Sequence, residues 1–232
     1  MPRFRVCGSS PLRSDLETAL ELGQFIAVFQ PFVAPRSGKV ELLEATMRWM
    51  HPARGMLAPH EFLCEAYQFD LLDQIAVSLV EQASIAAKAW RNNSWTKPGT
   101  NNLAVPISVN LSGATLSTHA ARTSINDCSA ALGLSANDLG IAGFSAVEGI
   151  QMIDVFQCDD TRDAITEHLI RNRRSKDIGL TGVSTLLQWY LSAESDAALV
   201  QGDFICPPTP CAGLIQALDQ WHSTFRIISA AT

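Results

Sequence analysis

The stretch Val40-Glu-Leu-Leu-Glu-Ala-Thr-Met-Arg-Trp-Met-His-Pro52 begins with a predicted strand over residues 40–47. A second strand is predicted just before it, over residues 25–32. The segment Pro35-Arg36-Ser37-Gly38 between them is rich in residues that favour turns. We therefore expect the two strands to form an antiparallel hairpin.

The rest of the chain alternates between strand-like and helix-like periodicity, which is typical of parallel βα units. Strands are predicted over residues 103–109, 139–144, 150–155, 178–183 and 199–205. Helices are predicted over residues 59–69, 71–90, 114–132, 160–172, 184–194 and 210–221. The predicted core contains Ile26, Val28, Leu43, Val105, Ile107, Val109, Ile141, Ile153 and Val183. No repeat or linker divides the chain, so residues 1–232 are expected to form a single domain.

Several short motifs follow in a fixed order. Glu44-Ala45-Thr46 with Arg48 is followed by Asn110 in Val-Asn-Leu-Ser. The other motifs are Phe29-Gln30-Pro31-Phe32, Gly55 to Phe62, Ile153-Asp154, Gly182-Val183 and Gln201-Gly202-Asp203-Phe204. Together they resemble the EAL-domain family of cyclic-di-GMP phosphodiesterases. The resemblance implies an α/β fold, a TIM-like (β/α) barrel of the EAL type whose first strand is antiparallel.

One part of the family pattern is missing. Only a few residues separate Phe144 from Ile153, where the resemblance calls for a strand ending in Asp-Asp-Phe-Gly-Thr-Gly and a helix. About one βα unit, roughly 30 residues, is therefore expected to be lost. The barrel should then be open, or its neighbouring strands should have closed the gap, because an exposed edge invites pairing with other chains.

The acidic residues that the resemblance implies are also mostly absent. Two-metal hydrolysis needs several carboxylates around ions roughly 4 Å apart. Glu44 and Asn110 match two ligand positions, but residues 139–145 contain no acid, and Thr181 and Ser184 replace two glutamates. Met152 replaces a lysine. Asp159-Asp160 are interpreted as the start of a helix and Glu148 as part of a loop. We expect no catalytic or metal-ligating residue, no cofactor and no hydrolysis.

Six residues remain as candidates for ligand binding at the matched positions: Gln30, Glu44, Arg48, Asn110, Asp154 and Gln201. Arg48 separates two hypotheses. If the site still binds nucleotide, its guanidinium should be free to contact a phosphate. If the site is vestigial, Arg48 should pair with Glu44 or Asp154, and this second hypothesis is the one we favour from sequence.

Charge and composition narrow the class of protein. The net charge of −6 argues against direct nucleic-acid binding, and the basic run from Arg171 to Lys176 is expected to be the solvated end of a helix. No apolar run reaches the roughly 18 residues of a membrane helix, and the start lacks the pattern of a secretory signal. The six cysteines show no metal-binding spacing and are expected to be reduced. A cytoplasmic protein is expected.

The resemblance then implies a non-catalytic regulatory domain in bacterial signalling that acts by binding a partner protein, because degenerate members of the family are known in that role. A cyclic-di-GMP-binding effector without hydrolysis is the alternative. A weak metal-dependent cyclic-di-GMP phosphodiesterase is a second alternative.

Overall fold

The computed structural model describes residues 12–91, 105–111, 118–135, 138–143, 146–147, 150–154, 178–195 and 197–230. The described helices are α1 (Arg13–Glu21), the one-turn 3-10 helix η1 (Pro59–Glu61), α2 (Leu63–Gln68), α3 (Leu72–Arg91), α5 (His119–Ala131), α7 (Leu186–Glu194) and α8 (Cys211–Ala230). The described strands are β1 (Phe25–Val33), β2 (Val40–His51), β3 (Gly55–Leu57), β4 (Ile107–Leu111), β5 (Leu139–Gly143), β6 (Ala146–Val147), β7 (Ile150–Asp154), β8 (Ile178–Thr181), β9 (Leu199–Val200) and β10 (Thr209–Pro210).

All of the described strands belong to one curled sheet. Its hydrogen-bonded order is β5-β4-β2-β1-β9-β8-β7-β6, while β3 extends β2 and β10 pairs with β1. The pairs β2–β4, β4–β5, β7–β8 and β8–β9 are parallel, and β1 is antiparallel to both β2 and β9. The fold is therefore the expected TIM-like α/β arrangement with an antiparallel first strand.

The β1–β2 hairpin closes at the predicted turn. The amide of Ala34 donates to the carbonyl of Lys39 (2.9 Å), and Gly38 has φ +65°, a conformation that favours glycine. Helix α8 packs against this turn. The indole N–H of Trp221 donates to the Gly38 carbonyl (2.8 Å), and the ring of Phe225 occupies the space that a Cβ on residue 38 would need.

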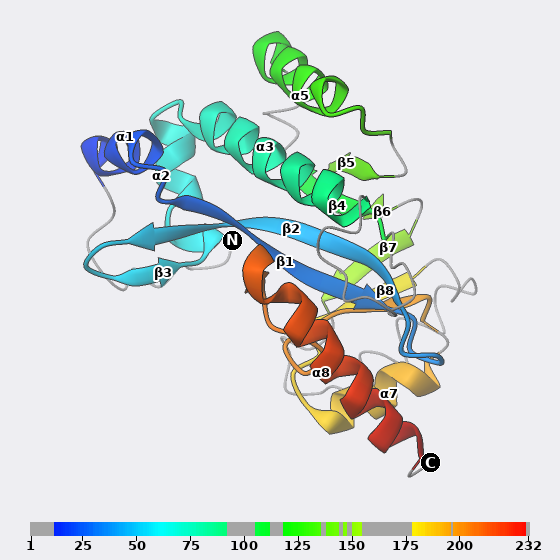
Figure 1. Ribbon diagram of the computed structural model, residues 1–232. Helices are drawn as coiled ribbons and strands as arrows, with labels where there is room; N and C mark the ends of the chain where they lie inside the picture. Colours follow the sequence, from blue (N-terminus) through cyan, green and yellow to red (C-terminus); the bar gives the residue numbers. More distant parts are fainter. Residues whose placement is uncertain are drawn as a thin grey trace.

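Helix α3 packs on one side of this hairpin and α8 on the other, while α5 packs on α3 (Figure 1). Helix α3 has the expected apolar face, which buries Ile75, Leu79 and Val80. Its Gln82 also accepts from the amide of Ala27 (2.8 Å) and donates to the carbonyl of Phe25 (2.9 Å). Helix α3 is therefore attached to β1 by polar as well as apolar contacts.

Several predicted boundaries and core positions were wrong. The helix predicted over 59–69 is divided into η1 and α2, because Phe62 between them has φ −145°. Helix α8 continues nine residues beyond the predicted end at residue 221, to Ala230, whereas β9 has only two residues. Ile26 and Val105 are half-buried instead of lying in the core. The predicted helix over 160–172 lies outside the described residues, as do the side chains of Ile141 and Ile153.

The sheet is open where the βα unit was expected to be lost. Its hydrogen-bonded path ends at β5 on one edge and at β6 on the other, and β6 forms a short antiparallel pair with β7. Within the described part of the chain no ladder joins β5 to β6. Of the two expected outcomes, the strands in the described part of the chain correspond to the open one.

Candidate functional site

The candidate site lies where β4, β2, β1 and β9 are side by side. Glu44 on β2 is directly opposite Gln30 on β1 and in register with Ser108 on β4. Asn110 follows two residues later on β4, and Gln201 follows the end of β9. Four residues from distant parts of the sequence are therefore brought to one end of the sheet.

Glu44 is the centre of a polar cluster. The side-chain amide of Asn110 donates to Oε1 of Glu44, and Nε2 of Gln201 donates to Oε2 at 2.8 Å. Gln201 is buried, with 5% of its surface exposed. Because Gln201 is 157 residues away in sequence, this contact ties the last part of the sheet to the first. We call Glu44, Asn110 and Gln201 the Glu44 cluster.

Burial raises the pKa of the Glu44 carboxyl group above its ordinary value of 4.5. The hydrogen bonds from Gln201 and Asn110, and the positive charge of Arg48, act in the opposite direction but do not cancel the effect. The amides of the Glu44 cluster therefore only partly replace the water that burial removes from this carboxylate.

Of the two acids that we expected to pair with Arg48, Glu44 does not form an ion pair with it in the described structure. Nη1 of Arg48 donates instead to the hydroxyl of Thr46 (3.2 Å) and to the carbonyl of Met47 (3.0 Å). Burial lowers the pKa of this half-buried guanidinium, while the nearby charges of Asp203 and Glu44 raise it. Within the described residues, Nη2 and Nε of Arg48 have no hydrogen-bond partner. Pairing with Asp154 stays a prediction, because the Asp154 side chain is not described.

Gln30 is joined to a residue that the sequence reading missed. Its Nε2 donates to Oδ1 of Asp203 (3.1 Å) and to the carbonyl of Cys206 (3.0 Å). Asp203 is exposed and is one of the two acids whose charge acts on Arg48. A signal for it was present, since Asp203 lies two residues after Gln201 within the closing motif.

The positions where the resemblance implies acids lie at or near strand ends. Ala142 on β5 is directly opposite Asn110, and Thr181 ends β8 opposite Asp154, the last residue of β7. Ser184 bonds to Gln188 in the first turn of α7. The residues at these three positions are alanine, threonine and serine, which carry no charge.

This donor set does not fit a pair of divalent ions. Both oxygens of Glu44 already accept N–H groups, and the next nearby carboxylate, Asp203, is exposed and bonded to Gln30. Among the residues that the structure describes, no three His, Cys, Asp or Glu side chains are grouped closely enough to hold a metal ion. A hard divalent cation needs several oxygen ligands with negative charge, which the described site does not supply.

A model of the EAL domain matches residues 13–142, which is more than half of the chain. The chain belongs to the EAL domain family. The part of the sheet that carries Gln30, Glu44, Arg48 and Asn110 lies inside the matched region, whereas Gln201 lies beyond it.

Similar sequences occur in larger proteins. An uncharacterized protein of Mycobacterium tuberculosis is 31% identical over 105 residues, which are 45% of this chain and 32% of the relative. The bifunctional diguanylate cyclase/cyclic di-GMP phosphodiesterase MucR of Pseudomonas aeruginosa is 34% identical over 79 residues, which are 34% of this chain and 12% of MucR. The matches therefore cover about a third or less of each relative.

Solved EAL structures share the fold over most of the chain. The PaMucR phosphodiesterase in complex with c-di-GMP matches with a TM-score of 0.71 at 22% identity, over 87% of this chain and 98% of that one. The cGMP-bound EAL enzyme Bd1971 matches with a TM-score of 0.73 at 15% identity, over 88% of this chain and 68% of that one. These likenesses confirm the EAL-type α/β fold in a shortened form.

Among the described helices, none has both the length and the apolar composition that crossing a membrane would require.

Proposed function

We propose that this EAL domain binds cyclic-di-GMP at the Glu44 cluster and Arg48 without hydrolysing it. The observation that carries the proposal is the half-buried guanidinium of Arg48, whose Nη2 and Nε have no partner in the described part of the chain. A cation that has lost part of its hydration and touches no counter-ion favours an anion in its place. A phosphate of cyclic-di-GMP supplies that anion.

We infer the absence of hydrolysis from the composition of the Glu44 cluster and of the neighbouring strand ends. A carboxylate that activates water through a metal must offer oxygens to that metal. In this chain Glu44 is the single carboxylate of the Glu44 cluster, and the facing strand ends carry Ala142 and Thr181. A ligand can therefore be held at this site, whereas the described residues do not supply the acidic set that would activate water against its phosphodiester bond.

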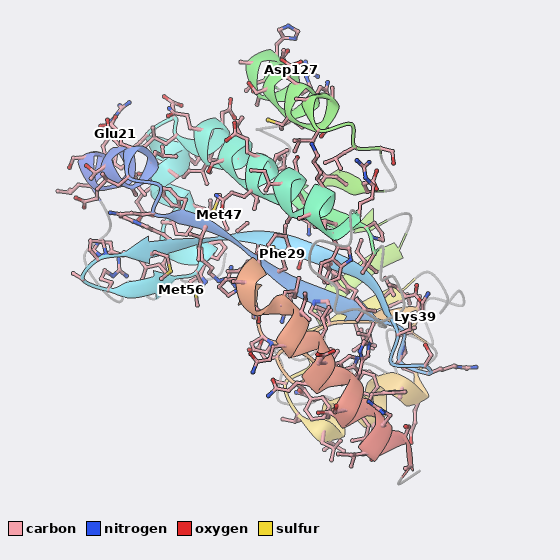
Figure 2. All side chains as sticks on the ribbon, viewed as in Figure 1. Glu21, Phe29, Lys39, Met47, Met56 and Asp127 are labelled. Carbon is pink, nitrogen blue, oxygen red and sulfur yellow. The ribbon has the colours of Figure 1, made fainter. Side chains whose placement is uncertain are left out.

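Binding of a partner protein is a second candidate function, and one observation favours it. Met50 and Met56 face each other across the β2–β3 ribbon, and they are 43% and 50% exposed. The ribbon extends beyond the rest of the sheet, with Met56 near its end (Figure 2). Pairs of exposed methionines occur on surfaces that adapt to protein partners.

The proposal is tested by titrating the purified protein with cyclic-di-GMP in a calorimeter. Arg48→Ala removes a charge-assisted contact typically worth about 1.5–3 kcal/mol, so the affinity should fall roughly 10- to 150-fold. The melting temperature should change little, because the bonds from Arg48 to Thr46 and Met47 are local.

The matched control is Arg13→Ala on α1, where the arginine is exposed and pairs only with Glu17 in the described structure. It should leave the affinity unchanged. A wild-type protein that binds no cyclic-di-GMP would refute the proposal and leave partner binding as the remaining function. Equal affinities of the wild type and Arg48→Ala for cyclic-di-GMP would show that Arg48 does not contact the nucleotide.

A further inference from the structure

The turn between β2 and β3 is held by a histidine side chain. His51 is the last residue of β2 and pairs with Gly55, the first residue of β3. Its Nδ1 accepts from the backbone amides of Ala53 (3.1 Å) and Arg54 (3.2 Å), which lie inside the turn. A single ring nitrogen is therefore the acceptor for two turn amides.

These two bonds identify the protonation state of the ring in the closed turn. A ring carbon or a protonated nitrogen in the place of Nδ1 could not accept an N–H group, so Nδ1 carries no hydrogen. The imidazole is then neutral, with its hydrogen on Nε2. The ring also lies beside the buried indole of Trp49, at 4.8 Å between centroids, which supports it in this orientation.

A second proton on this ring has only one place to go. Nε2 already carries a hydrogen, so the proton must bind Nδ1 and take up the lone pair that the two amides use. The new N–H would also point at the N–H groups of Ala53 and Arg54. Histidine is the side chain whose charge ordinarily changes between about pH 5 and pH 8. The two bonds are therefore present above this range and lost as the pH falls through it.

The charged groups around the turn do not offer its amides another acceptor within the described residues. Arg54 would repel an imidazolium, and its guanidinium bonds to Glu61 of η1 (3.2 Å). The other ionisable side chain of η1 is the exposed His60. Strands β1 and β3, which pair with this end of β2, contain no ionisable side chain. On α3, which also packs on β2, Asp73 and Glu81 bond to groups on the α5 side.

We propose that His51 is a pH-sensitive switch, which holds the β2–β3 turn while its imidazole is neutral and releases the turn in mildly acidic solution. Release changes the surface that carries Met50 and Met56, because these two residues face each other across the ribbon. It also loosens the cover of Leu57, which is 4% exposed on the opposite face. The switch goes beyond the proposed function, since the bonds of His51 involve neither the Glu44 cluster nor Arg48.

The test measures the exchange of the Ala53 and Arg54 amides with water by NMR on the whole protein. Protection factors, corrected for the intrinsic effect of pH on exchange, are compared at about pH 8 and pH 5. They should fall roughly thirtyfold in acid, the factor that corresponds to two hydrogen bonds of about 1 kcal/mol each. Protection that is equal at the two pH values would overturn the proposal.

Three substitutions assign the effect to His51. His51→Asn places an amide oxygen where Nδ1 lies, so it can accept the same two N–H groups and does not titrate. Its protection factors should stay high at both pH values. His51→Phe removes the acceptor and should give low protection at both. The matched control is His60→Asn on η1, which should keep the pH dependence of the wild type. A pH dependence that persists in His51→Asn, or disappears in His60→Asn, would contradict the role of His51.

Discussion

Burial raises the pKa of the Glu44 carboxyl group. The negative charge that this group carries at neutral pH therefore opposes folding. A carboxyl group whose pKa is raised on folding contributes stability that is fully present below its unfolded pKa. That contribution is lost as the pH rises through the folded pKa. Replacing Glu44 by glutamine keeps the shape and removes the charge. We therefore expect Glu44→Gln to gain stability relative to the wild type as the pH rises above 4.5.

This expectation is checked by urea unfolding of both proteins at a series of pH values. Glu41→Gln serves as the control, since Glu41 lies on the same strand but pairs with Lys39 at the surface. A difference in unfolding free energy between Glu44→Gln and the wild type that stays constant from pH 4 to pH 8 would show that burial does not act on this carboxyl group.

At the residue scale, the sequence predicted which side chains meet but not how they bond. Glu44 and Asn110 could be brought together from the expectation that parallel strands end at one edge. The bond between Gln201 and Glu44 depends on β1 lying between β2 and β9, which a linear sequence does not display. Arg48 donates to the Met47 carbonyl and the Thr46 hydroxyl, two local acceptors that the sequence pattern did not indicate, and its pairing with Asp154 stays a prediction.

At the element scale, the β1–β2 turn depends on the fit between Gly38 and α8. Gly38→Ala would place a Cβ 2.3 Å from the ring of Phe225 and would also keep alanine at φ +65°. The backbone strain alone costs roughly 1–2 kcal/mol. We expect Gly38→Ala to lower the free energy of unfolding by more than this, because the Phe225 ring must also move.

Gly133→Ala provides the comparison for this effect. Gly133 has φ +63°, but nothing lies within 4 Å of the position that its Cβ would take. It should therefore show the strain without the clash. Equal losses of stability for the two variants, measured by denaturant unfolding, would contradict the role assigned to the contact between α8 and the turn.

Elements with strong periodicity were predicted well, and elements set by tertiary contacts were not. The amphipathic pattern of α3 predicted both ends of this helix to within one residue. The short β9 could not be foreseen, because Gly202 turns the chain against the backbone of Val183, where a Cβ would lie 2.1 Å from the Val183 carbonyl oxygen. The extension of α8 follows from the packing of Phe225 on Trp189 and Trp221. Trp189 is far from Phe225 in sequence, and Trp221 lies one helical turn before it.

At the scale of the whole molecule, the central claim is that a shortened EAL sheet keeps a ligand site and loses the chemistry. The sheet is open beside β5, and the opposite strands carry neutral residues at their ends. The Glu44 cluster and Arg48 lie on the intact part of the sheet, between β4 and β9. We therefore propose that this protein retains nucleotide binding without hydrolysis.

The most direct test is to incubate the protein with cyclic-di-GMP and magnesium or manganese, dialyse to equilibrium, and separate the nucleotides by chromatography. The account predicts that cyclic-di-GMP is retained on the protein side and remains intact, with no more linear dinucleotide than in a control without protein. Formation of linear dinucleotide by the wild type, abolished in Glu44→Ala, would contradict it.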